Sequence, residues 1–575
     1  MKPNTKSKAK SKPTRTKKSY PVKVRAVSIR PAQADHSSEQ QAVYNVILET
    51  DDNAVVIAAA GSGKTFTLSH LAWQIEDRRS DYRMTYVVFN TRNKNEAESK
   101  FPASVDVSTL HSLGCQILKS AGRIWTDREP DFKVWNFIAK MCPDPSLGIN
   151  NEVEKGKVKK EWARIKMKMK KLIDMARIKM LDQTVEDMMV CAVEEQIDLP
   201  PHWIAEAYRV LQEMNRQFWG DKTEVYPTTG IHCDFVDMIY LPSRFPEKCK
   251  LDKVYDLVMV DEFQDVSPMI YALLDTWLFK KNTRTIVVGD KAQAIYQFAG
   301  ADIKFFDLMV ARADTQVLTL GTCYRCAPEI ITEARQYVDY IHPWDGAASG
   351  EVVRDGDYEI AADGDFILCR KNRPIVSICL DMLGNGKRAV VRGRDIAEKL
   401  KELLDDVPEG VDFIQWLDNW VEAWITKTSE ARGWEEARVL KSEIFKDVKD
   451  RIGVLKDMAA RMPVTAMSAM IDAIFSDSET PNAVILSTIH KSKGLEADRV
   501  FVLDIGTIKD ANLKYVAITR ARKYLAYCTS PFADDDVEEV FGVPEDIGLS
   551  AIRYMDHPDD YSPSDLHGAD KLRLD

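Results

Sequence analysis

The sequence predicts an α/β protein with two parallel-sheet domains, each interrupted by a mainly helical insertion. Short apolar runs typical of buried strands alternate with helix-spaced apolar residues in two separate regions of the chain. Two strand-poor helical stretches interrupt these regions, and 575 residues exceed the length of one domain. The hydrophobic fraction of 45% is typical of a globular protein. No apolar run approaches the ~18 residues that would predict a membrane helix.

The first region contains five apolar runs that are typical of buried strands. We expect these strands at residues 55–57, 86–89, 105–107, 257–260 and 285–288. A helical stretch rich in Met, Lys and Trp separates the third from the fourth. We interpret this stretch as an insertion, because the loops after the first and fourth strands must share one site.

The second region repeats the pattern of buried strands. Its strands are expected at residues 317–320, 366–369, 389–391, 484–487 and 500–503. A helical segment at 400–480 interrupts them, and we interpret its tryptophans as packing in a small helical core: Trp416, Trp420, Trp424 and Trp434.

These patterns give one domain organisation. In chain order we expect a disordered basic arm (1–30), the first α/β domain (31–114 and 231–310) with its helical insertion (115–230), the second α/β domain (311–399 and 481–533) with a small helical insertion (400–480), and an acidic tail (534–575).

The net charge of −10 conceals a strong segregation of charge. Eleven basic residues and no acid lie in 1–30, and eleven more lie in 155–179, against only Glu161 and Asp174. Local basic patches bind phosphate backbones whatever the net charge. The 155–179 run is therefore a candidate DNA contact or a solvated helix face. The arm is a candidate DNA-binding tail or nuclear address. Ten cysteines without a framework spacing indicate reduced thiols in a cytosolic compartment.

Two segments supply the parts of a nucleoside triphosphate site. The first follows the strand at 55–57 and precedes a helix: Ala58-Ala59-Ala60-Gly61-Ser62-Gly63-Lys64-Thr65. Glycine loops in this context bind phosphate through backbone N–H groups, with the helix N-terminus facing the anion. We expect contacts from Ala60 to Thr65, with Lys64 on the β- and γ-phosphates. Ala58 stands where the strict pattern has glycine.

The second segment is Asp261-Glu262, directly after the strand at 257–260. Asp261 and the Thr65 hydroxyl are the candidate Mg²⁺ ligands. Glu262 is left to orient or deprotonate the attacking water.

Further motifs follow in order along the chain. They are Ser37-Ser38-Glu39-Gln40-Gln41, Phe89-Asn90-Thr91, Thr109-Leu110-His111-Ser112, the segment 288–301, Leu320-Gly321-Thr322-Cys323-Tyr324-Arg325, the segment 487–496, and Tyr515-Val516-Ala517-Ile518-Thr519-Arg520-Ala521. In this order they resemble the motifs of the UvrD/Rep-like superfamily 1 (SF1A) DNA helicases, from about residue 37 to 530. The resemblance implies two RecA-like P-loop domains.

The resemblance also implies individual roles. Gln40, with Gln41 as the alternative, would read adenine, and Tyr324 would stack on it. Gln293 and Arg325 would contact the γ-phosphate, Glu496 the ribose, and Arg520 would act as an arginine finger. The residues implied to contact DNA are Asn90, Thr109, His111, Tyr296, Phe298, Thr488 and His490. Phe298-Ala299 stands where the family usually has Trp-Arg, which removes an arginine contact with DNA.

The function implied is an ATP- and Mg²⁺-dependent DNA helicase or translocase, moving 3′-to-5′ on single-stranded DNA in replication, repair or recombination. Expected substrates are single-stranded DNA and its junctions with duplex. Expected partners are replication or repair proteins that bind at the termini. We expect a monomer or weak oligomer that does not contact a membrane. The expected location is cytoplasmic and DNA-associated, or nuclear. The alternative is a DNA-dependent ATPase that acts as a non-unwinding translocase or as a regulatory module. A P-loop kinase or GTPase-like switch is disfavoured by the two arginines and by the segments at 288–301 and 487–496.

Overall fold

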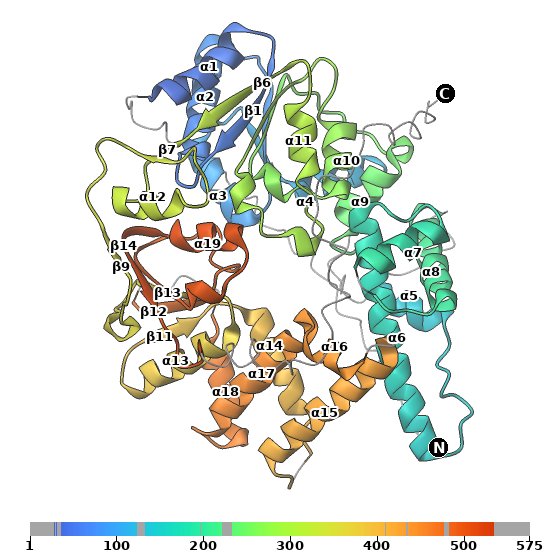
Figure 1. Ribbon diagram of the computed structural model, residues 1–575. Helices are drawn as coiled ribbons and strands as arrows, with labels where there is room; N and C mark the ends of the chain where they lie inside the picture. The colour runs from blue at the N-terminus through green and yellow to red at the C-terminus, as the bar shows by residue number, and fades with distance from the viewer. Residues whose placement is uncertain are drawn as a thin grey trace, which may run out of the picture.

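The computed structural model describes residues 28, 30, 36–122, 133–195, 197–220, 233–408, 410–432, 435–476 and 482–533. The predictions for the acidic tail, for Trp434 and for the basic arm apart from Ser28 and Arg30 lie outside these residues. Figure 1 shows two sheet-containing domains, one above the other, with one group of helices at the right, level with the second domain, and another below the second domain.

The first domain is built on a six-stranded parallel sheet in the order β3-β2-β4-β5-β1-β6. Its strands are β1 (Asn53–Ala58), β2 (Met84–Val88), β3 (Asp106–Thr109), β4 (Leu257–Val260), β5 (Arg284–Gly289) and β6 (Thr315–Leu320). Separate hydrophobic clusters cover the two faces of this sheet. Burial on both faces explains why the inner strands are nearly continuous apolar runs.

Seven helices accompany this sheet in the described part of the chain. They are α1 (Ser38–Glu49), α2 (Lys64–Arg78), α3 (Thr91–Lys100), α4 (Leu110–Ser120), α9 (Asp237–Arg244), α10 (Pro268–Trp277) and α11 (Lys304–Val310). The loops that follow β1, β2, β3, β4 and β5 all leave from the carboxyl edge of the sheet. That edge therefore gathers the polar segments singled out in the sequence.

The sequence pattern predicts that the strand at 317–320 belongs to the second domain, and this prediction is wrong. It is β6, and it pairs in parallel with β1 from Asn53↔Thr315 to Ala58↔Leu320. Half of its residues are only partly buried, as expected of an edge strand. An apolar pattern predicts a strand but not which sheet it joins, since pairing partners are set by tertiary contacts.

The first insertion consists of four helices in the described residues: α5 (Lys133–Met141), α6 (Glu152–Lys179), α7 (Val185–Glu194) and α8 (Pro201–Trp219). They share a core to which α6 contributes Trp162, Met169, Leu172 and Ile173. At the end of α6, the guanidinium of Arg177 is buried among the carboxylates of Asp174, Asp234 and Asp237. These ion pairs join the insertion to the segment that re-enters the first domain.

The second domain also has a six-stranded parallel sheet, in the order β11-β12-β10-β13-β14-β9. Its strands are β9 (Glu351–Val353), β10 (Phe366–Cys369), β11 (Ala389–Val391), β12 (Val484–Thr488), β13 (Ala497–Leu503) and β14 (Ala521–Cys528). The sequence had not predicted β9 or β14. A two-stranded ladder of β7 (Thr322–Cys323) and β8 (His342–Pro343) lies beside helix α12 (Pro328–Ala334). Helices α13 (Asn372–Gly384) and α19 (Ala511–Ile518) complete this domain.

The second insertion packs on the second domain. Its helices are α14 (Arg394–Asp405), α15 (Phe413–Arg432), α16 (Glu436–Leu440), α17 (Glu443–Ala459) and α18 (Val464–Ile474). Three tryptophans of α15 are half-buried and pack against the hydrophobic core that the insertion shares with the second domain, as the sequence predicted: Trp416, Trp420 and Trp424.

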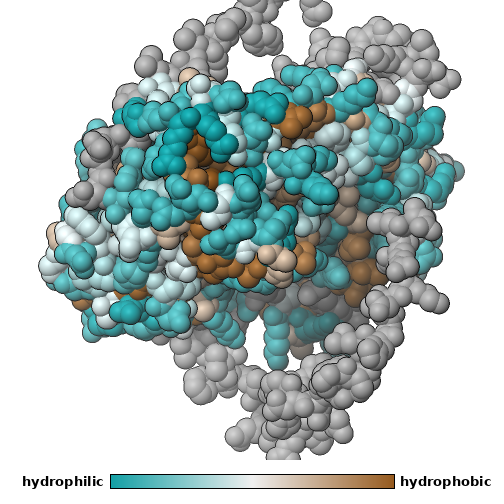
Figure 2. All heavy atoms as spheres, turned by 90° about the horizontal axis from the view of Figure 1, so that it is seen from above, coloured by the Kyte–Doolittle hydropathy of each residue, from teal (hydrophilic) through white to brown (hydrophobic). Residues whose placement is uncertain are grey.

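Hydrophilic side chains predominate on the face shown in Figure 2, and hydrophobic ones gather in hollows between them. The described helices include none whose length and apolarity would let it cross a bilayer. Among the described Phe, Tyr and Trp residues, the most exposed are Phe298 (69%) and Phe235 (58%). Phe298 is itself expected to contact DNA, and Phe235 stacks on His111, which is expected to do the same.

Candidate nucleotide and DNA site

The glycine loop lies between β1 and α2, where the sequence predicted it. Ala58 is the last residue of β1 and is fully buried, so the missing first glycine belongs to the strand and not to the turn. Gly61 and Gly63 make the turn with φ values of +68° and +78°. A Cβ atom on Gly61 would lie 2.6 Å from Cβ of Arg325, so the glycine loop also packs closely against the segment that carries Arg325.

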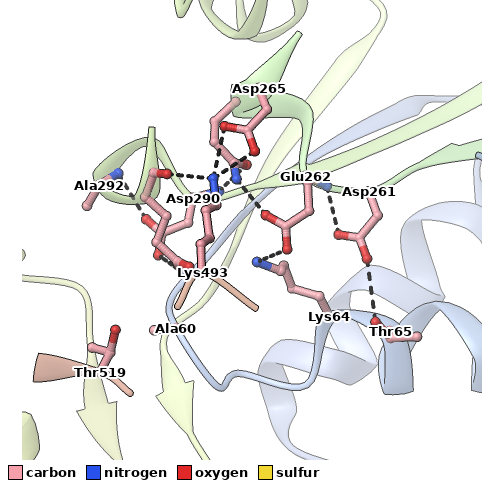
Figure 3. Close-up of polar contacts among 12 residues, drawn as sticks. Ala60, Lys64, Thr65, Asp261, Glu262, Asp265, Asp290, Ala292, Lys493 and Thr519 are labelled. Carbon is pink, nitrogen blue, oxygen red and sulfur yellow. Dashed lines mark hydrogen bonds and ion pairs between the residues drawn. The ribbon is translucent and has the colours of Figure 1, made fainter. Parts of the chain in front are cut away.

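Asp261 and Glu262 directly follow β4 and face the loop (Figure 3). The Thr65 hydroxyl lies 3.4 Å from Asp261 Oδ2, and the buried Tyr86 hydroxyl donates to the same oxygen at 2.6 Å. Two adjacent protein oxygens suit Mg²⁺, which takes its other ligands from water and substrate phosphates. Burial and the neighbouring Glu262 raise the pKa of Asp261, and a divalent cation there would offset that electrostatic cost.

Glu262 is held between two partners. Its Oε1 lies 3.2 Å from Nζ of Lys64, and its Oε2 accepts from Gln264 Nε2 at 2.5 Å. Burial alone would raise the pKa of this carboxyl group, but Lys64 and Lys493 lower it to about 2. Glu262 is therefore a carboxylate at neutral pH, which is the form a general base requires.

Three polar side chains from distant parts of the chain approach the same site. Gln293 donates to Asp290 at 2.7 Å, and Nη2 of Arg520 lies 3.5 Å from Oε1 of Gln293. Arg325 forms an ion pair with Glu496 and donates to the carbonyl of Thr519 at 3.3 Å. Burial, followed by repulsion from Arg325, lowers the pKa of Arg520 to about 10, so the Arg520 guanidinium remains charged at neutral pH. An anionic phosphoryl group between Arg325 and Arg520 would relieve this repulsion.

The candidate adenine residues lie beside the loop. Gln40 is buried, and its Nε2 lies 3.6 Å from the position of a Cβ on Gly63, while Tyr324 is 3.9 Å from that position. The carbonyl of Gln40 accepts from Ser37 N in a capping box, which fixes the amide in place. Gln41 is exposed and donates to Asn45, so the geometry favours Gln40 over the alternative.

The residues expected to contact DNA from the first domain are helix caps. Oδ1 of Asn90 accepts from Asn93 N, and Oγ1 of Thr109 accepts from Ser112 N. The N-termini of α3 and α4 thus follow the carboxyl ends of adjacent strands, a position that favours phosphate. His111 stacks on Phe235 with ring centroids 3.6 Å apart. Phe235 is a candidate DNA contact that sequence reasoning missed, because nothing in its local pattern distinguishes it from a core residue.

The remaining candidate DNA residues bridge the two domains. The Tyr296 hydroxyl donates to the carbonyl of His490 at 3.1 Å, and the exposed ring of Phe298 lies edge-on to His490 with centroids 5.7 Å apart. Thr488 is only 8% exposed, at the end of β12, so its hydroxyl has little open surface. Burial lowers the pKa of both His111 and His490 to about 4.

Lys493 and Asp265 form a further inter-domain contact that the sequence reasoning did not single out. Nζ of Lys493 lies 2.7 Å from Asp265 Oδ2 (Figure 3). It also donates to the carbonyl of Gln293 at 2.7 Å. Burial raises the pKa of Asp265 to about 6, against the lowering effect of Lys493. Lys493 lies inside the 487–496 motif, which was the available signal.

A continuous cleft of about 1340 Å³ brings most of these residues together, whereas Gln40, Thr109, Phe298, Thr488 and His490 are not among those that line it. It is lined by both domains and by Ile178 at the base of the insertion. Of the predicted site residues, those that line it are Gly61, Ser62, Gly63, Lys64, Thr65, Asn90, His111, Asp261, Glu262, Gln293, Tyr296, Tyr324, Arg325, Glu496 and Arg520. Ala60 departs from expectation, because its amide donates to Tyr515 rather than facing the cleft.

Comparison with known proteins agrees with this geometry. Residues 37–313 match the model of the UvrD/REP helicase N-terminal domain, and residues 483–526 match that of the UvrD-like helicase C-terminal domain. The chain is 23% identical to F-box DNA helicase 1 of Gallus gallus, over 85% of this chain and 48% of the relative. It is 22% identical to F-box DNA helicase protein 1 of Schizosaccharomyces pombe, over 85% and 57%.

A third relative is the ATP-dependent DNA helicase PcrA of Staphylococcus epidermidis, 25% identical over 53% of this chain and 40% of the relative. The chain thus spans about half the length of the curated relatives it matches. The two family models match segments that contain the glycine loop, Asp261-Glu262, Gln293, Glu496 and Arg520. The chain belongs to the UvrD/Rep-like family of superfamily 1 helicases.

Proposed function

We propose that this chain is an ATP-driven motor that translocates on single-stranded DNA and unwinds adjoining duplex. The carrying observation is that Lys64 and Glu262 of the first domain face the same cleft as Arg325 and Arg520 of the second. A nucleotide held by both sets of groups favours a closed cleft, and its hydrolysis removes the bridge.

The residues divide the chemistry of hydrolysis between the two domains. The loop amides and Lys64 bind the phosphates, and the ionised Glu262 orients the attacking water and accepts its proton. Arg325 and Arg520 stabilise charge on the transferring phosphoryl group. Thr65 and Asp261 would hold Mg²⁺, which when bound neutralises charge on the phosphates.

The proposed DNA path runs along the α3 and α4 N-termini, past Phe235, to Phe298 and His490. Exposed rings suit stacking on bases without reading their sequence. Helix N-termini suit phosphate. The path therefore fits single-stranded DNA and its junctions with duplex DNA. The proposal also includes 3′-to-5′ movement and a role in replication, repair or recombination, and both of these rest on the family resemblance.

DNA-stimulated ATP hydrolysis by the full chain tests the proposal. We expect hydrolysis to rise when single-stranded DNA is added, and Lys64→Ala to abolish it while DNA binding without nucleotide persists. Glu206→Gln, on α8 of the first insertion, is a control that should keep wild-type rates. An ATPase rate above a few per cent of wild type in Lys64→Ala would contradict the site assignment.

Strand displacement separates the proposed helicase from the alternative. A motor that unwinds should open a duplex carrying a 3′ single-stranded tail faster than one carrying a 5′ tail. ATP hydrolysis with movement along DNA but without opening of either duplex would instead favour a non-unwinding translocase or a regulatory module. The observation that motivates this alternative is the alanine at position 299, where the family usually has arginine.

A further inference from the structure

A buried carboxylate in the first domain is held by two tyrosines of the second. Asp290 follows β5 and is fully buried. Its Oδ1 accepts from the Tyr340 hydroxyl at 2.6 Å and from Ala292 N at 3.1 Å. Its Oδ2 accepts from Gln293 Nε2 at 2.7 Å and from the Tyr515 hydroxyl at 3.2 Å. Tyr340 and Tyr515 both lie in segments that pack in the core of the second domain.

Tyr515 has a second contact, with the glycine loop itself. Its hydroxyl oxygen accepts from the backbone amide of Ala60 at 3.0 Å. A phenolic hydroxyl has one proton to donate, and here that proton goes to Asp290 while a lone pair receives Ala60. One buried hydroxyl of α19 therefore joins the phosphate loop to the segment that carries Gln293.

The surroundings keep this hydroxyl protonated. Burial, followed by the charge of Asp290, raises the pKa of Tyr515 well above its ordinary value. The same two causes raise the pKa of Tyr340. Both tyrosines are therefore hydrogen-bond donors throughout the physiological pH range.

We propose that Tyr515 is a positioning residue that transmits movement of the second domain to the phosphate loop and to Gln293. This inference rests on the proposed ATPase function. When the second domain moves, α19 moves with it, and the hydroxyl must either carry the two bonded elements or release both. Release removes the Tyr515 acceptor from the buried Ala60 amide and one donor from the buried carboxylate of Asp290, which is unfavourable. The position of the domain and the shape of the loop are thereby linked.

The linkage predicts an effect on the loop amide that does not depend on activity. Tyr515→Phe keeps the buried ring and removes only the hydroxyl. We expect hydrogen exchange of the Ala60 amide, followed in the full chain without nucleotide, to accelerate by about tenfold, the usual scale for one hydrogen bond. Exchange equal to wild type would overturn the proposal.

Tyr527→Phe is the matched control. Its hydroxyl is also buried and donates to Glu333 at 3.1 Å, but both residues belong to the second domain. This variant should leave exchange at Ala60 unchanged. Equal acceleration in both variants would show that removing any buried tyrosine hydroxyl loosens the fold, and would overturn a specific role for Tyr515.

Kinetics supply the second arm of the test. The phosphate contacts of Lys64 and of the loop from Gly61 onward stay in place in Tyr515→Phe. We therefore expect the KM for ATP to stay within about twofold and kcat to fall by about tenfold. Tyr340→Phe removes the other inter-domain bond to Asp290 without touching Ala60, so it should lower kcat with normal exchange at Ala60.

The outcomes separate the two proposals. An inactive wild type would defeat the proposed function, and the exchange of Ala60 would still decide the role of Tyr515. An active wild type with unchanged kcat and unchanged exchange in Tyr515→Phe would defeat the inference alone.

Discussion

Glu262 shows how much of the site depends on single side chains. Its backbone adopts φ +52°, a left-handed conformation that is uncommon outside glycine and that costs ~1–3 kcal/mol. Strain of this kind persists where surrounding contacts hold it, and here Lys64 and Gln264 bind both carboxylate oxygens. The conformation directs the carboxylate across to the loop. The sequence predicts Glu262 as the candidate base, but its local pattern does not predict this backbone conformation.

Glu262→Gln should bind ATP and DNA and hydrolyse ATP at least ~10²-fold more slowly, the usual scale for an acid-base group. The amide keeps the shape and removes the charge. Because the pKa of Glu262 is about 2, the carboxylate stays ionised as pH falls from 7 to 5. The wild-type kcat should then show no acidic limb from this group in that range. Near-normal turnover in the variant would exclude Glu262 as the base.

The two candidate DNA histidines are neutral at physiological pH, since burial places both pKa values near 4. They would meet phosphate as hydrogen-bond donors and not as cations. His490→Gln keeps a donor, so it should leave the slope of log affinity for DNA against log salt unchanged, because each cationic phosphate contact contributes roughly 1 to that slope. Titration of DNA binding at several salt concentrations measures it. A slope reduced by about 1 would show a charged His490.

The same burial has a consequence for stability. The folded pKa of each histidine lies below its unfolded value, so protons bind more readily to the unfolded chain as pH falls from about 6.5 to about 4. The contribution of His490 to stability is present above that window and is lost within it.

Helix α6 illustrates how packing changes the meaning of a charge run. The sequence left its eleven basic residues open between a DNA contact and a solvated face. In the structure, the C-terminal half is largely neutralised: Lys168 pairs with Asp198, Lys170 with Asp174, and Lys179 with Glu194 and Glu195. Exposed lysines remain in the N-terminal half, among them Lys157 and Lys159. A DNA contact, if α6 makes one, belongs to that half.

Changing Lys157 and Lys159 to Gln should weaken DNA binding and lower the salt slope by roughly 1 for each phosphate that the variant no longer neutralises. Changing Lys170 and Lys179 to Gln is the matched control, because their charges are already paired within the insertion. ATPase activity at saturating DNA should persist in both double variants. Equal slopes in wild type and in the Lys157/Lys159 variant would establish the solvated-face interpretation.

At the scale of elements, local patterns predicted most buried strands and the interruption of each domain by helices. They failed where long-range pairing decides the outcome. The edge strand β6 joined the first sheet, and β14 went unpredicted because the charged Arg522-Lys523 pair interrupts its apolar pattern. The site followed the same division. Motifs pointed to Lys64 and Arg520, whereas only tertiary structure brings Phe235 to the cleft and the Tyr515 hydroxyl to the amide of Ala60.

At the scale of the whole molecule, the two domains meet through contacts that surround the nucleotide and DNA residues. Lys493 pairs with Asp265, Tyr296 donates to the backbone of His490, and Tyr515 reaches Asp290. Each contact joins a residue of one domain to a motif of the other. Movement of one domain relative to the other would therefore act on the nucleotide groups and on the candidate base-stacking rings at the same time.

Phe298→Ala should uncouple this motor. The ring is 69% exposed and lies edge-on to His490 of the opposite domain, so it is placed to hold a base rather than to fill a core. With alanine at 299, fewer side chains are available to bind DNA. Losing the stacking of one base on an aromatic ring costs ~1–3 kcal/mol of binding free energy. Gln293 lies in a separate turn, bonded to Asp290, and its position should not change.

We therefore expect Phe298→Ala to keep substantial DNA-stimulated ATPase and to displace strands poorly. The measurement is the number of base pairs opened per ATP consumed at saturating DNA, compared with wild type. Ile360→Ala, which removes another exposed apolar side chain outside the cleft, should keep the wild-type ratio. A ratio that Phe298→Ala leaves unaltered would place the stepping contact elsewhere along the path, with Phe235 as the next ring to change.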